Sequence, residues 1–138
     1  MAGTVLLDSS ALVAALRERD FEHEWARASF QALTEPVVTC DAVLSECFFL
    51  LAGWPRGKQM LCELLDDAII KIDFKAFENI PHLVRLIRRY ADTPMSFADA
   101  CLVRMSELSH DSTVFTMDRA FVFYRRNGRQ TIPLICPW

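Results

Sequence analysis

The 138-residue sequence has no apolar run long enough to cross a membrane. Its longest uncharged apolar run, CFFLLAGW at residues 47–54, is far shorter than the roughly 20 residues that a spanning helix needs. The first residues, MAGTVLLD, lack the basic start and the cleavage site of a secretory signal peptide. We therefore expect a soluble, cytoplasmic protein.

Cysteine pairs and histidine clusters are also missing. The cysteines are odd in number, form no CxxC pair and lie among apolar residues: Cys40, Cys47, Cys62, Cys101 and Cys136. The three histidines occur singly. This pattern indicates reduced, mostly buried thiols and argues against a disulfide framework or a zinc site. The sequence also lacks the GxxxxGK[ST], GxGxxG and GxSxG motifs of common nucleotide-binding and hydrolase sites.

Positive charge is scarce overall but unevenly distributed. The net charge of -3 argues against bulk electrostatic attraction to nucleic acid. Residues 119–138 nevertheless contain four arginines and no acid, so this tail carries +4 and residues 1–118 carry -7. The tail arginines are Arg119, Arg125, Arg126 and Arg129, and a second cluster is Arg85, Arg88 and Arg89. For any single arginine a solvated position is the simpler interpretation, but a local basic patch on an acidic body is compatible with the sequence.

Short β-rich runs alternate with helical patterns along the chain. We expect strands at 4–8, 36–40, 68–73, 112–118 and 131–136, and helices at 10–19, 21–33, 41–52, 57–65, 75–90 and 97–109. This alternation predicts an α/β domain with a mostly parallel sheet, and the continuous apolar first and fourth runs suit strands covered on both faces. With 52% hydrophobic residues, the whole chain 1–138 is expected to form one domain, with a helix break at 53–57.

Two acidic residues stand at the ends of expected strands. Ligands of open parallel sheets bind outside the carboxyl ends of the strands, and Asp8 and Asp118 end the first and fourth strands. Each also suits a helix cap or a turn, and Asp8 is followed by Ser9 and Ser10, which are good caps themselves. Taken singly, the two acids leave both interpretations open.

Glu46 lies inside an expected helix rather than at its end. Its neighbours at three and four residues are apolar: Ala42, Val43, Phe49 and Leu50. A glutamate on such a stripe needs a partner or must stay protonated. An arginine or a metal ion would serve, and we favour a metal because no other acid of this helix shares its placement.

The stretch MSFADACLV at 95–103 contains a third acid of this kind. Ser96 and Asp99 have the spacing of a capping box, in which the serine caps the helix and the acid reaches back. Leu102 and Val103 also put Asp99 on the core-facing stripe, which favours a role beyond capping, although the two roles can coexist.

Together the four acids suggest one site. Two at strand ends and two on helix faces can meet at one edge of the sheet, where like charges raise each other's pKa values unless a cation is bound. Oxygen ligands of this type suit Mg²⁺ or Mn²⁺.

The sequence resembles the PIN-domain ribonucleases and, more narrowly, the VapC-type toxins. The resemblance rests on four stretches, in the family's order and spacing and over nearly the whole chain: LLDSSALVAAL, LSECFFLLA, MSFADACLVRMSE and VFTMDRAFVFYRR. It implies a three-layer α/β/α sandwich around a mostly parallel sheet of four or five strands. It also implies a homodimer and, for a toxin, a cognate antitoxin.

The resemblance further implies a catalytic site. The family's acidic tetrad, which holds one or two Mg²⁺ or Mn²⁺ ions for RNA hydrolysis, falls on Asp8, Glu46, Asp99 and Asp118. Ser10 and Thr116 match positions where the family often has a hydroxyl near the metal. Asp92 falls outside the tetrad and is interpreted as a turn residue.

The arginine tail suits contact with RNA. Arg119, Arg125, Arg126 and Arg129 are expected to guide the RNA backbone without reading its sequence. Phe121, Phe123 and Tyr124 could stack on unpaired bases, although core packing is the simpler role for the two phenylalanines. The alternative function is a non-catalytic PIN-fold module that binds RNA or protein. A haloacid-dehalogenase-like phosphatase is disfavoured, because the first strand ends in DSS rather than DxD.

Overall fold

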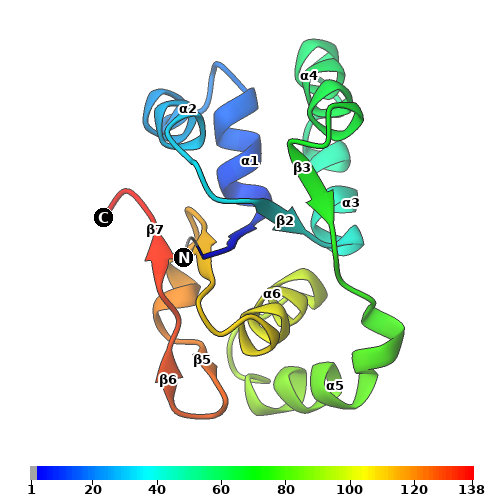
Figure 1. Cartoon of the computed structure of the whole chain (residues 1–138), viewed down its shortest axis with the longest axis vertical. Helices are drawn as coiled ribbons and strands as arrows, with labels where there is room; N and C mark the ends of the chain where they lie inside the picture. Colours follow the sequence, from blue (N-terminus) through cyan, green and yellow to red (C-terminus); the bar gives the residue numbers. More distant parts are fainter. Residues whose placement is uncertain (1–2) are drawn as a thin grey trace.

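A five-stranded parallel sheet forms the centre of the computed structural model, which describes residues 3–138 (Figure 1). The strands are β1 (Val5–Leu7), β2 (Val37–Thr39), β3 (Ile70–Ile72), β4 (Thr113–Phe115) and β7 (Leu134–Ile135). Their order across the sheet is β3-β2-β1-β4-β7, and every neighbouring pair is parallel. The predicted α/β class with a parallel sheet is thus confirmed.

Helices cover both faces of this sheet. They are α1 (Ser9–Leu16), α2 (His23–Gln31), α3 (Asp41–Leu50), α4 (Pro55–Asp66), α5 (Ile80–Arg89) and α6 (Phe97–Leu108), with short 3₁₀ helices η1 (Ala76–Asn79) and η2 (Arg119–Val122). In Figure 1, α1, α2 and α4 lie on one side of the sheet and α5 and α6 on the other. Helix α3 contacts both α1 and α6, so it joins the two layers near the carboxyl end of β1.

The central strands are apolar because helices enclose them. All three residues of β1 are buried, and Val114 and Phe115 of β4 are fully buried as well. These strands bring Asp8 and Thr116 to the same edge of the sheet, where the Asp8 N–H donates to the Phe115 carbonyl at 3.0 Å.

Two expected elements are divided in the structure. The expected helix at 75–90 is interrupted, with η1 followed by α5, and Pro81 stands in the first turn of α5. Proline suits that position because it has no N–H to donate. The expected strand at 131–136 is also wrong as one piece: Gln130–Thr131 forms β6, and Leu134–Ile135 alone joins the main sheet as β7.

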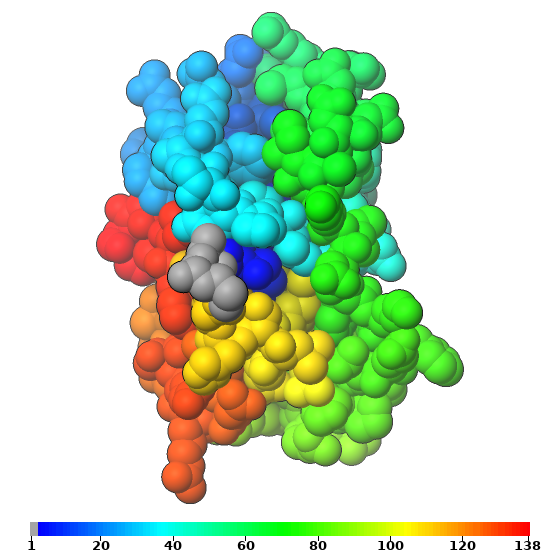
Figure 2. All heavy atoms as spheres, viewed as in Figure 1, coloured from blue at the N-terminus to red at the C-terminus, as the bar shows by residue number. Residues whose placement is uncertain are grey.

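An antiparallel hairpin near the C-terminus was not expected. Strand β5 (Arg125–Arg126) pairs with β6 across a turn in which Asn127 and Gly128 have φ values of 54° and 77°. An Asn-Gly pair favours such turns because both residues tolerate positive φ. This hairpin projects from the body at the lower edge of Figure 2.

The cysteines are free thiols, as expected. Cys40, Cys47 and Cys101 are buried, whereas Cys62 on α4 is exposed, contrary to the expectation of burial among apolar residues. Among the described residues, no helix is long and apolar enough to cross a membrane.

Candidate active site

Asp8 stands at the carboxyl end of β1 and is only 3% exposed. Its side chain caps α1, because Oδ1 accepts from the Ser9 N–H at 2.8 Å. Its other oxygen, Oδ2, accepts from the hydroxyls of Ser10 and Thr116, each at 2.7 Å. Asp8 is therefore a helix cap whose second oxygen is held in place by two hydroxyls.

Those two hydroxyls connect β1 to the end of β4. Ser10 Oγ accepts from the Met117 N–H at 2.9 Å, and Thr116 Oγ1 accepts from the Asp118 N–H at 2.9 Å. Each hydroxyl thus donates to the Asp8 carboxylate and accepts from the backbone that leads to Asp118. Ser10 and Thr116 therefore fix the position of one acid relative to another.

Glu46 approaches the same edge from α3. The Ser9 hydroxyl donates to Glu46 Oε1 at 2.7 Å, so consecutive residues of α1 contact two of the four acids. Glu46 is half-buried, and its neighbours Phe49 and Leu50 are 79% and 45% exposed. The expectation that Glu46 lies on a buried apolar stripe is therefore wrong in part, because α3 covers the core with Val43, Leu44 and Cys47 instead.

Asp99 is both the acid of a capping box and a buried side chain. The capping box is present: the Asp99 N–H donates to Ser96 Oγ at 3.0 Å, and the Ser96 N–H donates to Asp99 Oδ2 at 3.2 Å. Asp99 is nevertheless only 7% exposed. The Tyr124 hydroxyl donates to Asp99 Oδ2 at 3.1 Å, and Tyr124 is fully buried. Asp99 is thus an acid in the first turn of α6 that Tyr124, from near the end of the chain, contacts and helps to bury.

Asp118 follows β4 and caps η2. Its Oδ1 accepts from the Ala120 N–H at 2.9 Å, and the residue is exposed. Asp118 is therefore the acid of the set most accessible to a ligand. Asp92 lies in an exposed turn before α6, as interpreted from the sequence.

The charges of the four acids reach neighbouring titratable groups of the site. Burial, with a smaller contribution from the charge of Asp99, raises the pKa of Asp8 to about 6, and the hydrogen bonds from Thr116 and Ser10 oppose the rise. Burial also raises the pKa of Asp99, with the charge of Asp118 adding to it. Burial raises the pKa of the Cys47 thiol to about 12, and the charges of Asp8 and Glu46 contribute. Each acid is thus close enough to affect another titratable group of the site.

Tyr124 is a site residue that sequence reasoning did not assign. Burial, followed by the charge of Asp99, raises the pKa of its hydroxyl well above the usual value, so the group stays a neutral donor at neutral pH. Ser9, which donates to Glu46, was considered only as a cap. Both contacts join residues far apart in the chain, and no local pattern predicts them.

The chemistry of these side chains suits a hard divalent cation. Carboxylate and hydroxyl oxygens are the ligands that Mg²⁺ and Mn²⁺ prefer. Burial is the main cause of the raised pKa values of Asp8 and Asp99, neighbouring carboxylates add to it, and a bound cation would oppose both effects. Within residues 3–138, however, no group of three or more Asp, Glu, His or Cys side chains is close enough to hold an ion as the side chains stand. By the chemistry of its oxygen donors, the set fits a hard divalent cation.

The four tail arginines occupy different environments. Arg119 and Arg129 are exposed. Arg125 is half-buried and donates to the carbonyls of Val122 and Tyr124 at 2.8 and 3.1 Å. Arg126 is 7% exposed, and its Nη1 donates to the Ser106 carbonyl at 3.3 Å. Arg126 therefore packs against α6, and we leave it out of the surface available to RNA.

The aromatic residues of the same segment also differ. Phe121 is buried, as expected for core packing, whereas Phe123 is 68% exposed. The expectation of core packing is therefore correct for Phe121 and wrong for Phe123. Tyr124 is fully buried and cannot stack on a base.

Comparison with known proteins identifies the fold and a family. The family model of the PIN domain matches residues 5–127. No curated protein sequence matches the chain. VapC20 of Mycobacterium tuberculosis, a sarcin–ricin loop cleaving toxin, superposes with a TM-score of 0.73 at 18% identity, over 83% of this chain and 90% of that one. FitAcB of Neisseria gonorrhoeae superposes with a TM-score of 0.54 at 20% identity, over 83% of this chain and 87% of that one. At these identities the two structures support the fold.

Proposed function

Because the chain belongs to the PIN-domain family, we propose that it is a Mg²⁺- or Mn²⁺-dependent endoribonuclease and the toxin of a toxin–antitoxin pair. The observation that carries this proposal is the buried Asp8 carboxylate, held by Ser10 and Thr116 at the carboxyl end of the sheet. Glu46, Asp99 and Asp118 surround the same edge. A site built to keep negative charges together is well suited to a cation and to phosphate chemistry.

Each acid of this site is positioned by different residues of the chain. Asp8, fixed by three hydrogen bonds, holds a constant position at the end of β1. Tyr124 orients the Asp99 carboxylate, and Ser9 orients that of Glu46. Asp118 presents an exposed carboxylate after β4, the strand next to β1. When bound, a divalent cation would lower the pKa of a water molecule and offset charge on the phosphate oxygens.

Two exposed arginines in the segment after Asp118 support RNA as the substrate. Arg119 follows Asp118 directly, and Arg129 lies in the turn of the β5–β6 hairpin. Both are free to contact phosphates, which supplies affinity without sequence readout. Arg125 contributes less, because its guanidinium already donates to two backbone carbonyls.

The test is cleavage of a structured RNA by the full chain with Mg²⁺ or Mn²⁺. Asp8→Asn and Asp99→Asn are each expected to lower the rate by at least about 100-fold, since each removes a charged ligand. Asp92→Asn is the matched control, because Asp92 is an exposed acid outside the site and its loss should leave the rate unchanged. Cleavage that survives both site substitutions in a clean preparation would overturn the proposal.

A homodimer is also proposed, and an exposed apolar stripe supports it. Phe77, Ile80, Val84 and Ile87 follow one another on η1 and α5 at spacings of three and four residues and are 89%, 42%, 36% and 37% exposed. Apolar residues gathered in this way are typical of interaction surfaces. Val84→Glu is expected to shift the protein to the monomer in sedimentation, whereas Val122→Glu, at an exposed valine elsewhere, should not.

The proposed antitoxin would be a second protein that suppresses cleavage. A small open reading frame next to this gene that encodes a DNA-binding protein would supply the candidate. We expect the two proteins to copurify after co-expression, with little RNA cleavage by the complex. Full activity of the copurified complex would contradict the assignment.

A non-catalytic PIN-fold module that binds RNA or protein is the second candidate. It is favoured by one observation: among the described residues, three metal-ligating side chains do not converge. Thermal unfolding with Mn²⁺ separates the two, because a ligand at 100 times its Kd stabilises the folded state by about 2.7 kcal/mol. A rise in Tm that Asp99→Asn abolishes supports the nuclease. Intact folding with no rise supports the binding module.

A further inference from the structure

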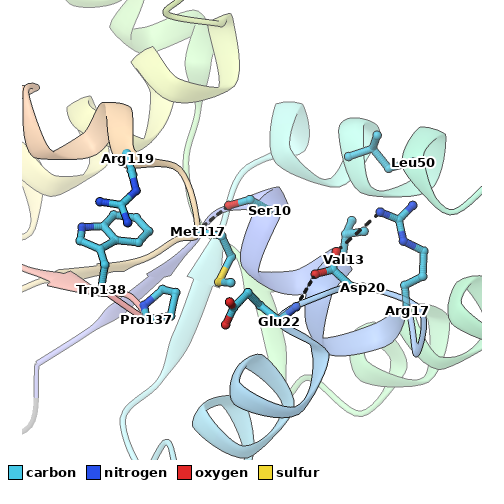
Figure 3. A pocket seen from close by; sticks show the side chains of 10 residues that line it. All are labelled: Ser10, Val13, Arg17, Asp20, Glu22, Leu50, Met117, Arg119, Pro137 and Trp138. Carbon is cyan, nitrogen blue, oxygen red and sulfur yellow. Dashed lines mark hydrogen bonds and ion pairs between the residues drawn. The ribbon is translucent and has the colours of Figure 1, made fainter.

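A cavity of about 470 Å³ opens beside the acidic site (Figure 3). Ser10 and Met117, which are hydrogen-bonded to each other through Ser10 Oγ, form the wall that it shares with the site. Residues of α1, of the loop before α2, of the end of α3, of η2 and of the C-terminal segment complete the lining. The volume is that of a pocket for a small organic ligand. A group bound here lies next to the Asp8 and Asp118 network.

One wall of the cavity is aromatic and cationic. The Arg119 guanidinium carbon lies 4.7 Å from the centre of the Trp138 ring, and Trp138 is 39% exposed. The stacked pair is visible at the left of Figure 3. Unpaired RNA bases stack on such surfaces, both on aromatic rings and on arginine planes. The positive charge of Arg119 also suits the phosphate of the same nucleotide.

The opposite wall holds two carboxylates, one with partners in the fold and one without. Asp20 is occupied: its Oδ2 lies 3.6 Å from Arg17 Nη2, and its Oδ1 accepts from the Glu22 N–H at 3.0 Å. The Glu22 carboxylate has no hydrogen-bond or ion-pair partner within the described part of the chain. Figure 3 shows it extending into the cavity towards Met117 and Pro137. The cavity thus contains one half-buried acceptor group that the fold itself does not use.

We propose that this cavity binds an unpaired guanine of the RNA substrate, with Glu22 as the residue that selects it. The inference rests on the proposed ribonuclease function. A carboxylate only accepts hydrogen bonds and accepts two in parallel. On its Watson–Crick edge, guanine presents two adjacent donors, N1–H and the N2 amino group. Adenine and cytosine each place a ring acceptor beside their amino group, and uracil has one donor between two carbonyls. Only guanine therefore satisfies both oxygens of Glu22.

Nucleotide binding by the full chain in EDTA tests the site without requiring catalysis. In calorimetric titrations GMP should bind at least about fivefold more tightly than AMP, CMP or UMP, which is the low end for a bidentate base contact. Glu22→Gln should abolish this preference, because a glutamine amide presents one donor and one acceptor and every one of the four bases offers a matching donor–acceptor pair. Glu24→Gln, at an exposed glutamate of the same helix, should retain the GMP preference. Equal affinities for the four nucleotides would overturn the inference.

The Glu22 variant is expected to remain folded. Glu22 precedes α2, but its side chain makes no capping hydrogen bond, so the substitution removes no contact of the fold. Its Tm should match that of the unmodified protein. Trp138→Ala should weaken binding of all four nucleotides to a similar degree, because stacking is tolerant of base identity. A selective loss of GMP binding in Trp138→Ala would contradict the assigned roles.

RNA cleavage separates this inference from the proposed function. In a series of single-stranded oligonucleotides with one guanine moved along the chain, the cut should follow the guanine at a fixed distance. Cleavage that is independent of guanine overturns the guanine site and leaves the nuclease intact. GMP-selective binding in a protein that cleaves no RNA supports the guanine site and overturns the nuclease.

Discussion

Replacing Asp8 by Asn should stabilise the metal-free protein while removing its function. The variant keeps the shape of the side chain and an oxygen for the Ser9 N–H, and it loses the buried charge. The pKa of Asp8 is raised from 3.8 to about 6 by burial. That difference corresponds to a cost of about 3 kcal/mol for holding the ionised carboxylate in the fold at neutral pH. An asparagine side chain is uncharged, so burying it does not carry this cost.

Part of this gain is offset by the hydrogen bonds around the side chain. The Ser10 and Thr116 hydroxyls both donate to Asp8 Oδ2, and an amide nitrogen at that position would require them to turn. We therefore expect a net increase in the free energy of unfolding of about 1–3 kcal/mol at pH 7.5 in EDTA. For a domain of this size that raises Tm by about 3–12 °C.

The pH dependence follows from the direction of the shift. A carboxyl group whose pKa is higher in the folded than in the unfolded state favours folding when protonated. The unmodified protein should therefore lose stability as the pH rises from about 4 to about 6, with the full cost present above pH 6. The stability difference between Asp8→Asn and the unmodified protein should accordingly shrink as the pH falls towards 4.

Urea denaturation followed by circular dichroism, at several pH values between 4.5 and 7.5, measures this difference. In Mn²⁺ we expect the unmodified protein to become the more stable of the two, because it gains stability from the bound ion and the variant does not. If Asp8→Asn is less stable than the unmodified protein in EDTA at pH 7.5, the cost assigned to the buried carboxylate is wrong.

Three further substitutions separate structural from functional contacts. Ser96→Ala should lower the free energy of unfolding by about 1 kcal/mol through loss of the α6 cap, and it should leave RNA cleavage largely intact. Asp99→Asn should instead abolish cleavage first. If Asp99→Asn lowers stability in urea denaturation but leaves the cleavage rate unchanged, Asp99 is a purely structural residue. Tyr124→Phe should lower stability by about 1–2 kcal/mol and lower the cleavage rate through a misoriented Asp99, whereas unchanged cleavage with the same loss of stability would make Tyr124 a core residue only. Thr116→Val removes a donor to Asp8 and an acceptor for the backbone after β4, and should cost about 1–3 kcal/mol by urea denaturation; a neutral effect would contradict the role assigned to this hydroxyl.

The main elements of the fold follow from local patterns in the sequence. Runs of apolar residues coincide with the strands of the main sheet, and the helices fall between them, because enclosed parallel strands are apolar throughout. The β5–β6 hairpin was missed even though Asn127 and Gly128 are a recognised signal for such a turn. The division of η1 from α5 is likewise marked by Pro81.

The acids of the candidate site could be named from the sequence, but their hydrogen-bond partners could not. Asp8, Asp99 and Asp118 were identified from strand ends and helix position, and all three also cap a helix, as the sequence allowed. Glu46 was identified partly for a wrong reason, since Phe49 on its stripe is exposed rather than buried. The partner of Asp99, Tyr124, lies 25 residues along the chain, and only the assembled fold brings the two together.

The most direct test is the single-turnover rate of cleavage of one structured RNA as a function of Mn²⁺ concentration. The account predicts a rate that rises with Mn²⁺ to saturation, is abolished by EDTA, and falls by at least about 100-fold in Asp99→Asn while the variant remains folded. Equal cleavage by Asp99→Asn, or cleavage by the unmodified protein that persists in EDTA, would contradict it.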